Sequence, residues 1–254
     1  MNEYTLTGDY TLPSLGKVYN KEVNPNVRLR SMTVMEEQKR LNNSDRPYKN
    51  LASILDDCLI EKPGISAYDL CLSDFQFLLH RLRVVTYGPN YKLSSRCPNC
   101  GFDNEGEINL LDIPVIQYTE DLNKYLEITL PVSKQVVKLK MQTPRMMDDI
   151  SVESKRMAKR HHSGTATESA FLLSVSTAID TVDGEVLDAF KKESFVKELQ
   201  MADANYLLKA INKINDSFGI DTSLNNICDS CGFEYTSPFR TTPEFFRPSV
   251  DFEF

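Results

Sequence analysis

Two short cysteine motifs, far apart in the sequence, carry the clearest chemistry in the chain. Residues 97–102 read Cys-Pro-Asn-Cys-Gly-Phe, and residues 228–233 read Cys-Asp-Ser-Cys-Gly-Phe. With two residues between the cysteines, one tight turn aims both sulfurs at a single point, and the glycine lets the backbone bring amide groups toward the thiolates. Two such turns supply the four thiolates of a closed tetrahedral zinc site. We therefore predict that one structural Zn²⁺ is held by Cys97, Cys100, Cys228 and Cys231.

The same cysteines allow other chemistries. A thioredoxin-like redox pair is disfavoured, because no βαβ pattern precedes either pair and the motif occurs twice. Two disulfides are disfavoured, because residues 1–4 lack the basic start of a secretory signal and a reducing compartment opposes disulfides. An iron–sulfur cluster, or a thiophilic metal other than zinc, stays open as an alternative. The two remaining cysteines, Cys58 and Cys71, have apolar neighbours and are predicted to be buried thiols.

The composition is that of an ordinary globular protein. The 254 residues are 41% hydrophobic and 26% charged, and the net charge of −7 disfavours a general nucleic-acid binder. The sequence contains no run of eighteen apolar residues, the length that would predict a membrane span. Three histidines provide little material for acid–base catalysis, and the phosphate-loop, nucleophile-elbow and kinase motifs are absent from the sequence. Because a closed four-cysteine site also leaves no open coordination position, we predict that the protein is not an enzyme.

Hydrophobic periodicity predicts an α+β fold in which short strands carry the cysteines. Strands are expected over 91–96 and 104–110, around the first motif. The excursion 101–227 is expected to contain a hairpin of 125–130 with 136–141, followed by a largely helical region. We expect the zinc-ribbon-like four-cysteine core to join short strands at the base of the fold. The predicted division is an N-terminal arm with strands (1–32), a helical segment (33–90), a zinc-knuckle region (91–110 and 222–240), a hairpin plus helical insertion (111–221) and a C-terminal aromatic tail (241–254).

Local signals in the N-terminal third predict helix starts and one loop. Residues 33–36 (Thr-Val-Met-Glu) and 73–76 (Ser-Asp-Phe-Gln) both fit a capping box, so a helix is expected to begin at each. Arg81 and Arg83 are assigned to the polar side of the second helix. The turn at 12–19, which contains Pro and Gly, is interpreted as a surface loop, with docking on a neighbouring protein as the alternative.

The C-terminal tail has four phenylalanines in its last ten residues, among prolines and carboxylates. An isolated tail of this kind exposes apolar surface, so it packs either on its own chain or on a partner. Both alternatives are open from the sequence. The candidate partner-binding residues are Phe245, Phe246, Arg247, Phe252 and Phe254.

Several segments taken together suggest a family. They are Leu-Pro-Ser-Leu-Gly at 12–16, Arg-Leu-Arg-Ser-Met-Thr at 28–33, Tyr-Gly-Pro-Asn-Tyr at 87–91, the two cysteine motifs and Phe-Phe-Arg-Pro at 245–248. In this combination the chain resembles the baseplate protein family of contractile-tailed bacteriophages, the T-even-like baseplate hub and hub-assembly group. The resemblance covers essentially the whole chain.

The resemblance implies a binding and assembly role without catalysis. It implies a protein made in the cytoplasm of the host bacterium that acts at the tail baseplate, with other phage baseplate or hub proteins as partners. It does not decide between a virion component and an assembly factor, and it leaves homo-oligomerisation open. The alternative is a zinc-ribbon nucleic-acid-binding regulator, supported by the basic helix end at 155–160 and opposed by the acidic charge balance.

Overall fold

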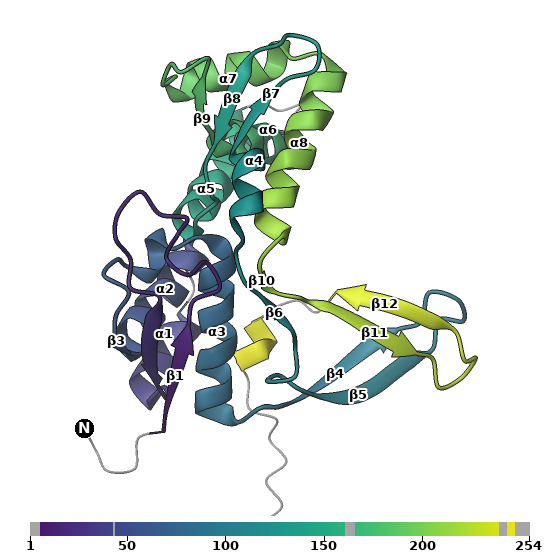
Figure 1. Ribbon diagram of the computed structural model, residues 1–254. Coiled ribbons are helices and arrows are strands. Elements are labelled where there is room, and N and C mark those ends of the chain that lie inside the picture. Colours follow the sequence, from purple (N-terminus) through teal and green to yellow (C-terminus); the bar gives the residue numbers. More distant parts are fainter. Residues whose placement is uncertain (1–5, 43, 161–165, 239–242, 247–254) are drawn as a thin grey trace, which may run out of the picture.

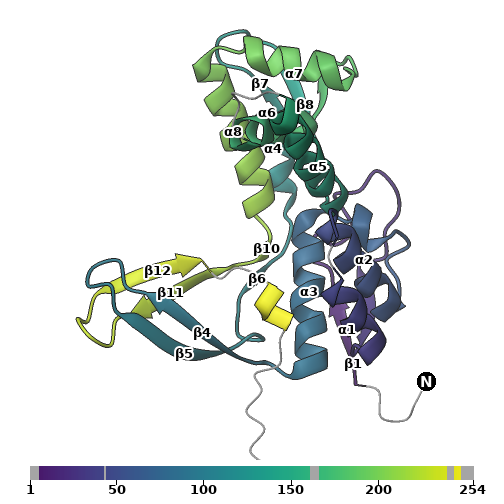
Figure 2. The same ribbon diagram turned by 180° about the vertical axis from the view of Figure 1, so that it is seen from behind.

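The computed structural model describes residues 6–42, 44–160, 166–238 and 243–246. It has three parts, which can be followed in Figure 1. We call them the body (6–89), the insertion lobe (117–218) and the arm (90–109 with 223–238). The arm projects away from the other two parts in Figure 1 and again in the rear view of Figure 2. The predicted mixture of helices and strands is confirmed.

The body is a three-stranded antiparallel sheet, ordered β1-β2-β3, packed against three helices. Its elements are β1 (Thr7–Thr11), β2 (Asn26–Arg30), α1 (Val34–Leu41), α2 (Pro47–Cys58), β3 (Leu59–Glu61), the short 3-10 helix η1 (Ala67–Asp69) and α3 (Leu72–Tyr87). Leu29, Leu55 and Leu78 are fully buried where the sheet and helices meet. Cys58 is buried as predicted, and burial raises the pKa of its thiol to about 12.

The predicted capping box at the start of α1 is confirmed. The Thr33 hydroxyl accepts from the Met35 amide at 3.3 Å, and the Glu36 carboxylate accepts from the Thr33 amide at 2.7 Å. Glu36 also accepts from Nη2 of Arg30 at 2.8 Å. One buried carboxylate thus fixes the helix start and ties it to the last residue of β2.

The capping box predicted at the start of α3 is wrong. The helix begins at Leu72, and Cys71 at its N-cap makes no side-chain cap bond. Asp74 instead accepts from the Ser14 amide at 2.9 Å and from the Tyr19 hydroxyl at 2.6 Å. Burial raises the pKa of Asp74, against the opposing effect of these donors. The carboxylate therefore holds a distant loop and leaves its own helix terminus uncapped.

The loop at 12–19 is consequently not the plain surface loop that its composition predicts. Leu12 and Ser14 are both 0% exposed. The Ser14 hydroxyl donates to Asp74 at 2.5 Å, and the Tyr118 amide donates to the Pro13 carbonyl at 2.8 Å. The loop is buried because its polar groups find partners on α3 and at the entrance to the insertion lobe.

Arg81 and Arg83 are also buried, which corrects their assignment to a polar face. They are 8% and 2% exposed. The Arg81 guanidinium lies 5.0 Å from the ring centroid of Phe77 and 5.8 Å from that of Tyr10. Nη1 of Arg83 donates to the Gly88 carbonyl at 2.8 Å. Aromatic faces and backbone carbonyls accept a guanidinium group inside a core, and a hydrophobicity pattern does not register such partners.

The insertion lobe begins and ends at one short strand pair, β6 (Val115–Ile116) with β10 (Gly219–Ile220), which the sequence analysis missed. Inside the lobe, strands ordered β7-β8-β9 pack on helices around Val137, Ile179 and Leu207. Its elements are η2 (Glu120–Leu122), α4 (Asn123–Leu126), β7 (Glu127–Thr129), β8 (Val136–Leu139), α5 (Pro144–Arg160), α6 (Ala166–Ala178), β9 (Ile179–Val182), α7 (Ala189–Glu198) and α8 (Met201–Asp216). The predicted hairpin, now β7 with β8, is confirmed.

Helix α5 connects the lobe to the body through a buried carboxylate. Asp148 is 0% exposed and accepts from the amides of Tyr48 at 3.2 Å and Lys49 at 2.8 Å. These amides belong to the first turn of α2, whose own N-cap residue makes no side-chain cap bond. An ion pair of 2.7 Å between Arg145 and Asp69 supports the same joint from outside. Asp148 of the insertion lobe thus accepts hydrogen bonds from first-turn amides of α2, which have no partner within that helix.

The arm consists of two antiparallel hairpins, β4 (Asn90–Arg96) with β5 (Asp103–Asn109) and β11 (Ser223–Ile227) with β12 (Glu234–Pro238). The turn of each hairpin is one of the cysteine motifs. Both motifs therefore lie at the end of the arm away from the body, as Figures 1 and 2 show. This corrects the expected position at the base of the fold. The β6–β10 pair lies nearer the body and already holds the ends of the insertion together.

Candidate metal centre

The two cysteine motifs fold into nearly identical turns. In the first, the Cys97 amide donates to the Phe102 carbonyl at 2.9 Å, and the Gly101 amide donates to the Cys97 carbonyl at 2.9 Å. The equivalent bonds in the second turn measure 3.0 Å, from Cys228 to Phe233, and 2.8 Å, from Gly232 to Cys228. Both glycines have a φ in the left-handed region, +74° and +69°, which a residue with a side chain adopts only with strain. The shared sequence thus specifies one local structure twice.

The turns face each other and bring the four predicted sulfur ligands together. All four sulfurs lie within 4.8 Å of one another. The pairs across the two turns are Cys97–Cys231 at 3.8 Å and Cys100–Cys228 at 3.5 Å. A zinc ion with Zn–S bonds of about 2.3 Å has S–S edges of about 3.8 Å, so the separations fit one tetrahedral ion. They are far longer than the S–S bond of about 2.05 Å in a disulfide, and all six cysteines are free thiols.

Backbone amides favour ionisation of these thiols, whereas the neighbouring sulfurs lower the pKa of Cys228 and raise that of Cys100. Desolvation opposes ionisation of Cys228, but donation from the amides of Cys231 and Ser230 outweighs it and lowers the pKa to about 6. The Phe233 amide and the Asn99 side chain lower the pKa of Cys231. At Cys100 the Phe102 amide favours ionisation, yet desolvation and the adjacent sulfurs raise the pKa to about 11. Amides thus favour the thiolate forms of Cys228 and Cys231, and the thiolate is the form in which cysteine binds a metal ion.

A polar cluster behind the sulfurs joins the two hairpins independently of any ion. Asn104 of β5 is 8% exposed, accepts from the Asp229 amide at 2.9 Å and donates to the Tyr235 hydroxyl at 3.0 Å. The Tyr235 hydroxyl also lies 2.7 Å from the Ser95 hydroxyl of β4. We call these four residues the hairpin clamp. Sequence reasoning missed the clamp. The available signal was an asparagine and a tyrosine at inward positions of two alternating strands.

The predicted tail residues divide into two groups. Residues 243–246 form η3 (Pro243–Phe246), and Phe245 and Phe246 are 0% and 3% exposed within the core of the body. The Phe245 ring lies 4.7 Å from that of His80 and 5.4 Å from that of Tyr91, measured between centroids. Of the two alternatives for the tail, these two phenylalanines therefore pack on the chain's own body.

The other three candidates of the tail, Arg247, Phe252 and Phe254, lie outside the described residues. The partner contact predicted for the tail stays a prediction.

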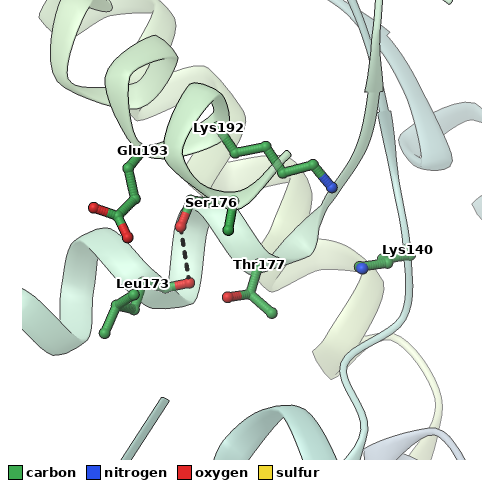
Figure 3. A pocket seen from close by; sticks show the side chains of 7 residues that line it. Lys140, Leu173, Ser176, Thr177, Lys192 and Glu193 are labelled. Atoms are coloured by element: carbon green, nitrogen blue, oxygen red, sulfur yellow. Dashed lines mark hydrogen bonds between the residues drawn. The ribbon is translucent and has the colours of Figure 1, made fainter. Parts of the chain in front are cut away.

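One pocket of about 200 Å³ lies in the insertion lobe between α6 and α7, and Figure 3 shows its lining. Ser176 donates to the Leu173 carbonyl at 3.2 Å, and the Lys192 ammonium donates to the Ile179 carbonyl at 2.7 Å. Burial and the nearby Lys140 lower the pKa of Lys192. The backbone thus already engages a hydroxyl and an ammonium group of this pocket, and its lining contains neither histidine nor cysteine. The pocket provides no nucleophile–base pair of the usual kind.

Within the described part of the chain, no helix is both long and apolar enough to cross a membrane. Comparison with curated proteins and with solved structures gives no match. A family model described as "T4 bacteriophage base plate protein" matches residues 1–247, nearly the whole chain and all three parts of the fold. The chain belongs to this phage baseplate family.

Proposed function

We propose that the protein is a structural or assembly component of the hub of a contractile-tail baseplate, and that it acts through protein–protein contacts. The observation that carries this proposal is the family match over residues 1–247. The arrangement of the chain supports a binding role. Two main cores carry the fold, and an arm with its own cluster of four cysteines projects from them.

We further propose that the four cysteines hold one structural zinc ion. Four thiols from two hairpins, with separations that fit a single tetrahedral ion, form a closed ligand set. Bound there, zinc supplies a cross-link between hairpins that are separate in sequence. The amides of Phe102 and Phe233 and the side chain of Asn99 orient the thiolates and stabilise their charge.

The charge of the arm disfavours the alternative of a nucleic-acid regulator. Asp103, Glu105 and Glu107 alternate along β5 and are all exposed. A phosphate backbone approaching this strand meets three carboxylates, whereas nucleic-acid-binding surfaces carry clustered lysine and arginine. DNA or RNA binding that weakens steeply with salt would favour the regulator.

Elemental analysis tests the zinc proposal. Protein purified without chelators is expected to contain about one zinc per chain, and a variant with all four cysteines changed to serine is expected to contain none. Recovery of iron with visible charge-transfer absorption would replace zinc by an iron–sulfur cluster. Recovery of intact disulfides, with no metal, would end the metal proposal.

A deletion of the gene in the phage, complemented in trans, tests the assembly role. Loss of the protein is expected to block formation of complete baseplates, as seen by electron microscopy of lysates. Mass spectrometry of purified particles then decides between a virion component and an assembly factor. Normal baseplates in cells that lack the protein would overturn the proposed function.

A further inference from the structure

The end of the arm exposes three large apolar side chains beside the cysteines. Phe102 and Phe233 occupy equivalent positions directly after the two motif glycines, and they are 46% and 44% exposed. Ile227, directly before Cys228, is 66% exposed. The four-cysteine site does not require these side chains, because the Phe102 and Phe233 contributions to the turns are backbone groups. Their exposure is therefore unexplained by the metal centre.

Carboxylates surround this apolar end. Asp103 and Glu105 follow Phe102 on β5, Asp229 lies within the second motif and Glu234 directly follows it, all with exposed side chains. Arg96 of β4, opposite Asp103 in the strand register, is an exposed cation at the same end. No ion pair among the described residues uses any of these four carboxylates. The end of the arm thus has an apolar centre and a rim in which four carboxylates outnumber the guanidinium of Arg96. An apolar centre within a polar rim is the usual layout of a protein-binding surface.

The arm end is also held in a defined shape before any partner binds. The hairpin clamp joins β5 to the second hairpin through Asn104, whose contacts to Asp229 and Tyr235 measure 2.9 Å and 3.0 Å. The four cysteines provide a second joint a few residues away. A surface that is ordered in the free protein loses little conformational entropy on binding, which favours a small contact built on two phenylalanines.

We propose that the end of the arm docks into an apolar recess with a basic rim on another protein of the baseplate. Phe102 and Phe233 enter the recess, with Ile227 beside them, and the carboxylates face lysines or arginines of the partner. The assignment of the partner to the baseplate rests on the proposed function. The chemistry of the recess rests on the side chains of the arm.

The acidic rim argues against other occupants. Two arm ends from two copies of this chain bring the four carboxylates of each copy together, so like charges repel. Nucleic acid and anionic membranes meet the same repulsion. A basic protein surface is the occupant whose charge complements Asp103, Glu105 and Glu234.

Site-specific photo-crosslinking identifies the occupant. A photoreactive phenylalanine analogue in place of Phe102 or Phe233 is placed in the full chain and expressed in cells infected with a phage that lacks its own copy. The matched control places the analogue at Phe190 of α7, which is 78% exposed on the insertion lobe. The expected adduct joins the arm to one phage baseplate protein, beside lysine or arginine residues. Adducts only with a second copy of this chain, or none above the Phe190 control, would overturn the inference.

A complementation assay measures whether the contact matters. The double substitution Phe102→Ser with Phe233→Ser is expected to lower the yield of complete baseplates by about tenfold or more, with the zinc content unchanged, because interface aromatics dominate binding. Phe190→Ser, the control, is expected to leave the yield unchanged. If the double variant loses zinc, Glu105→Lys with Glu234→Lys tests the rim instead and is expected to lower the yield similarly. Full yield from zinc-loaded arm variants would overturn the docking inference, whereas the proposed function fails only if cells without the protein assemble normal baseplates.

Discussion

Asn104 of β5 and Tyr235 of β12 share a hydrogen bond of 3.0 Å between the two hairpins of the arm. The two residues are 131 positions apart in the sequence. Because Asn104 also accepts from the Asp229 amide, its nearly buried side-chain amide is bonded both to β12 and to the turn that precedes it. The clamp therefore holds the two cysteine turns together, and it would act as outer support for the proposed metal ligands.

The clamp predicts a loss of metal affinity when Asn104 is removed. Asn104→Ala is expected to weaken zinc binding by roughly 10- to 100-fold, as for other residues that orient metal ligands, while the four sulfurs remain. Competition with a chromophoric chelator measures this change. Asn225→Ala is the comparison, because its side chain accepts from Thr236 at 3.1 Å within the second hairpin, and its loss is expected to leave the affinity unchanged. Equal affinities for wild type and Asn104→Ala would show that the cysteines alone hold the hairpins together.

Loss of one metal ligand is expected to loosen the arm and spare the rest of the protein. The main clusters of the body and the insertion lobe contain none of the four cysteines. Cys97→Ser should therefore accelerate amide exchange in 90–109 and 223–238, and leave exchange in α2 and α8 unchanged within error. Hydrogen-exchange mass spectrometry resolves these peptides. Cys71→Ser, at a cysteine outside the metal centre, is the contrast, because its buried thiol lies in the core that includes Phe218. Faster exchange throughout the Cys97→Ser protein would mean that the metal supports the whole fold.

The sequence predicts the clustering of the four cysteines well and their surroundings poorly, for physical reasons. The spacing Cys-x-x-Cys-Gly determines a local turn. Each pair of candidate ligands can therefore be predicted from residues that are close together in sequence. The hairpin clamp cannot be predicted in this way, because Asn104 contacts Tyr235 only after the two hairpins have packed together. The capping box predicted at 73–76 was wrong for the same reason, because Asp74 bonds a residue that is distant in sequence. Its partner Ser14 lies on a loop whose burial no local pattern reveals.

The mixture of helices and strands was predictable, whereas the placement of the arm was not. Long helices such as α5 and α8 have strong periodicity, so their existence follows from the sequence. The strands β6 and β10 have two residues each, too few for any periodicity. Their pairing decides where the insertion begins, and with it the distance of the metal centre from the body. The polar-face position predicted for Arg83 was wrong for another reason. The partners of its guanidinium are backbone carbonyls and aromatic rings, which carry no net charge and leave no charge pattern in the sequence.

The carboxylate of Glu36 is expected to make the free energy of unfolding depend on pH in the acid range. Hydrogen bonds from Arg30 lower its pKa from 4.5 to about 2, against the opposing effect of burial and with help from Thr33. Because the folded pKa lies below the unfolded value, this carboxylate stabilises the fold fully above about pH 4.5 and loses its effect as the pH falls toward 2. The contribution at neutral pH is on the order of 2–3 kcal/mol.

Glu36→Gln is expected to remove this contribution at pH 7 and to approach wild type only near pH 2. Urea unfolding of both proteins at each pH measures it, and the difference between them cancels acid loss of any metal. The exposed Glu61 supplies the control substitution, Glu61→Gln, with an expected change below about 0.5 kcal/mol. A variant that differs from wild type by the same amount at every pH would refute the assigned pKa.

The return of residues 243–246 to the body predicts that the chain end is part of the core. Phe245 is fully buried, and its carbonyl accepts from Nε of Arg83 at 3.0 Å. Phe245→Ala removes a large side chain from a packed site and is expected to lower the free energy of unfolding by about 3–5 kcal/mol. Deletion of 243–254 is expected to cost at least as much, because the buried Arg83 guanidinium then also loses a carbonyl partner. Deletion of 247–254 alone keeps both phenylalanines and is the matched control, with an expected change below about 1 kcal/mol. Urea unfolding of the three variants separates the core role of Phe245 from any role of the final residues. A folded 243–254 deletion with wild-type stability would show that this contact contributes nothing to the core.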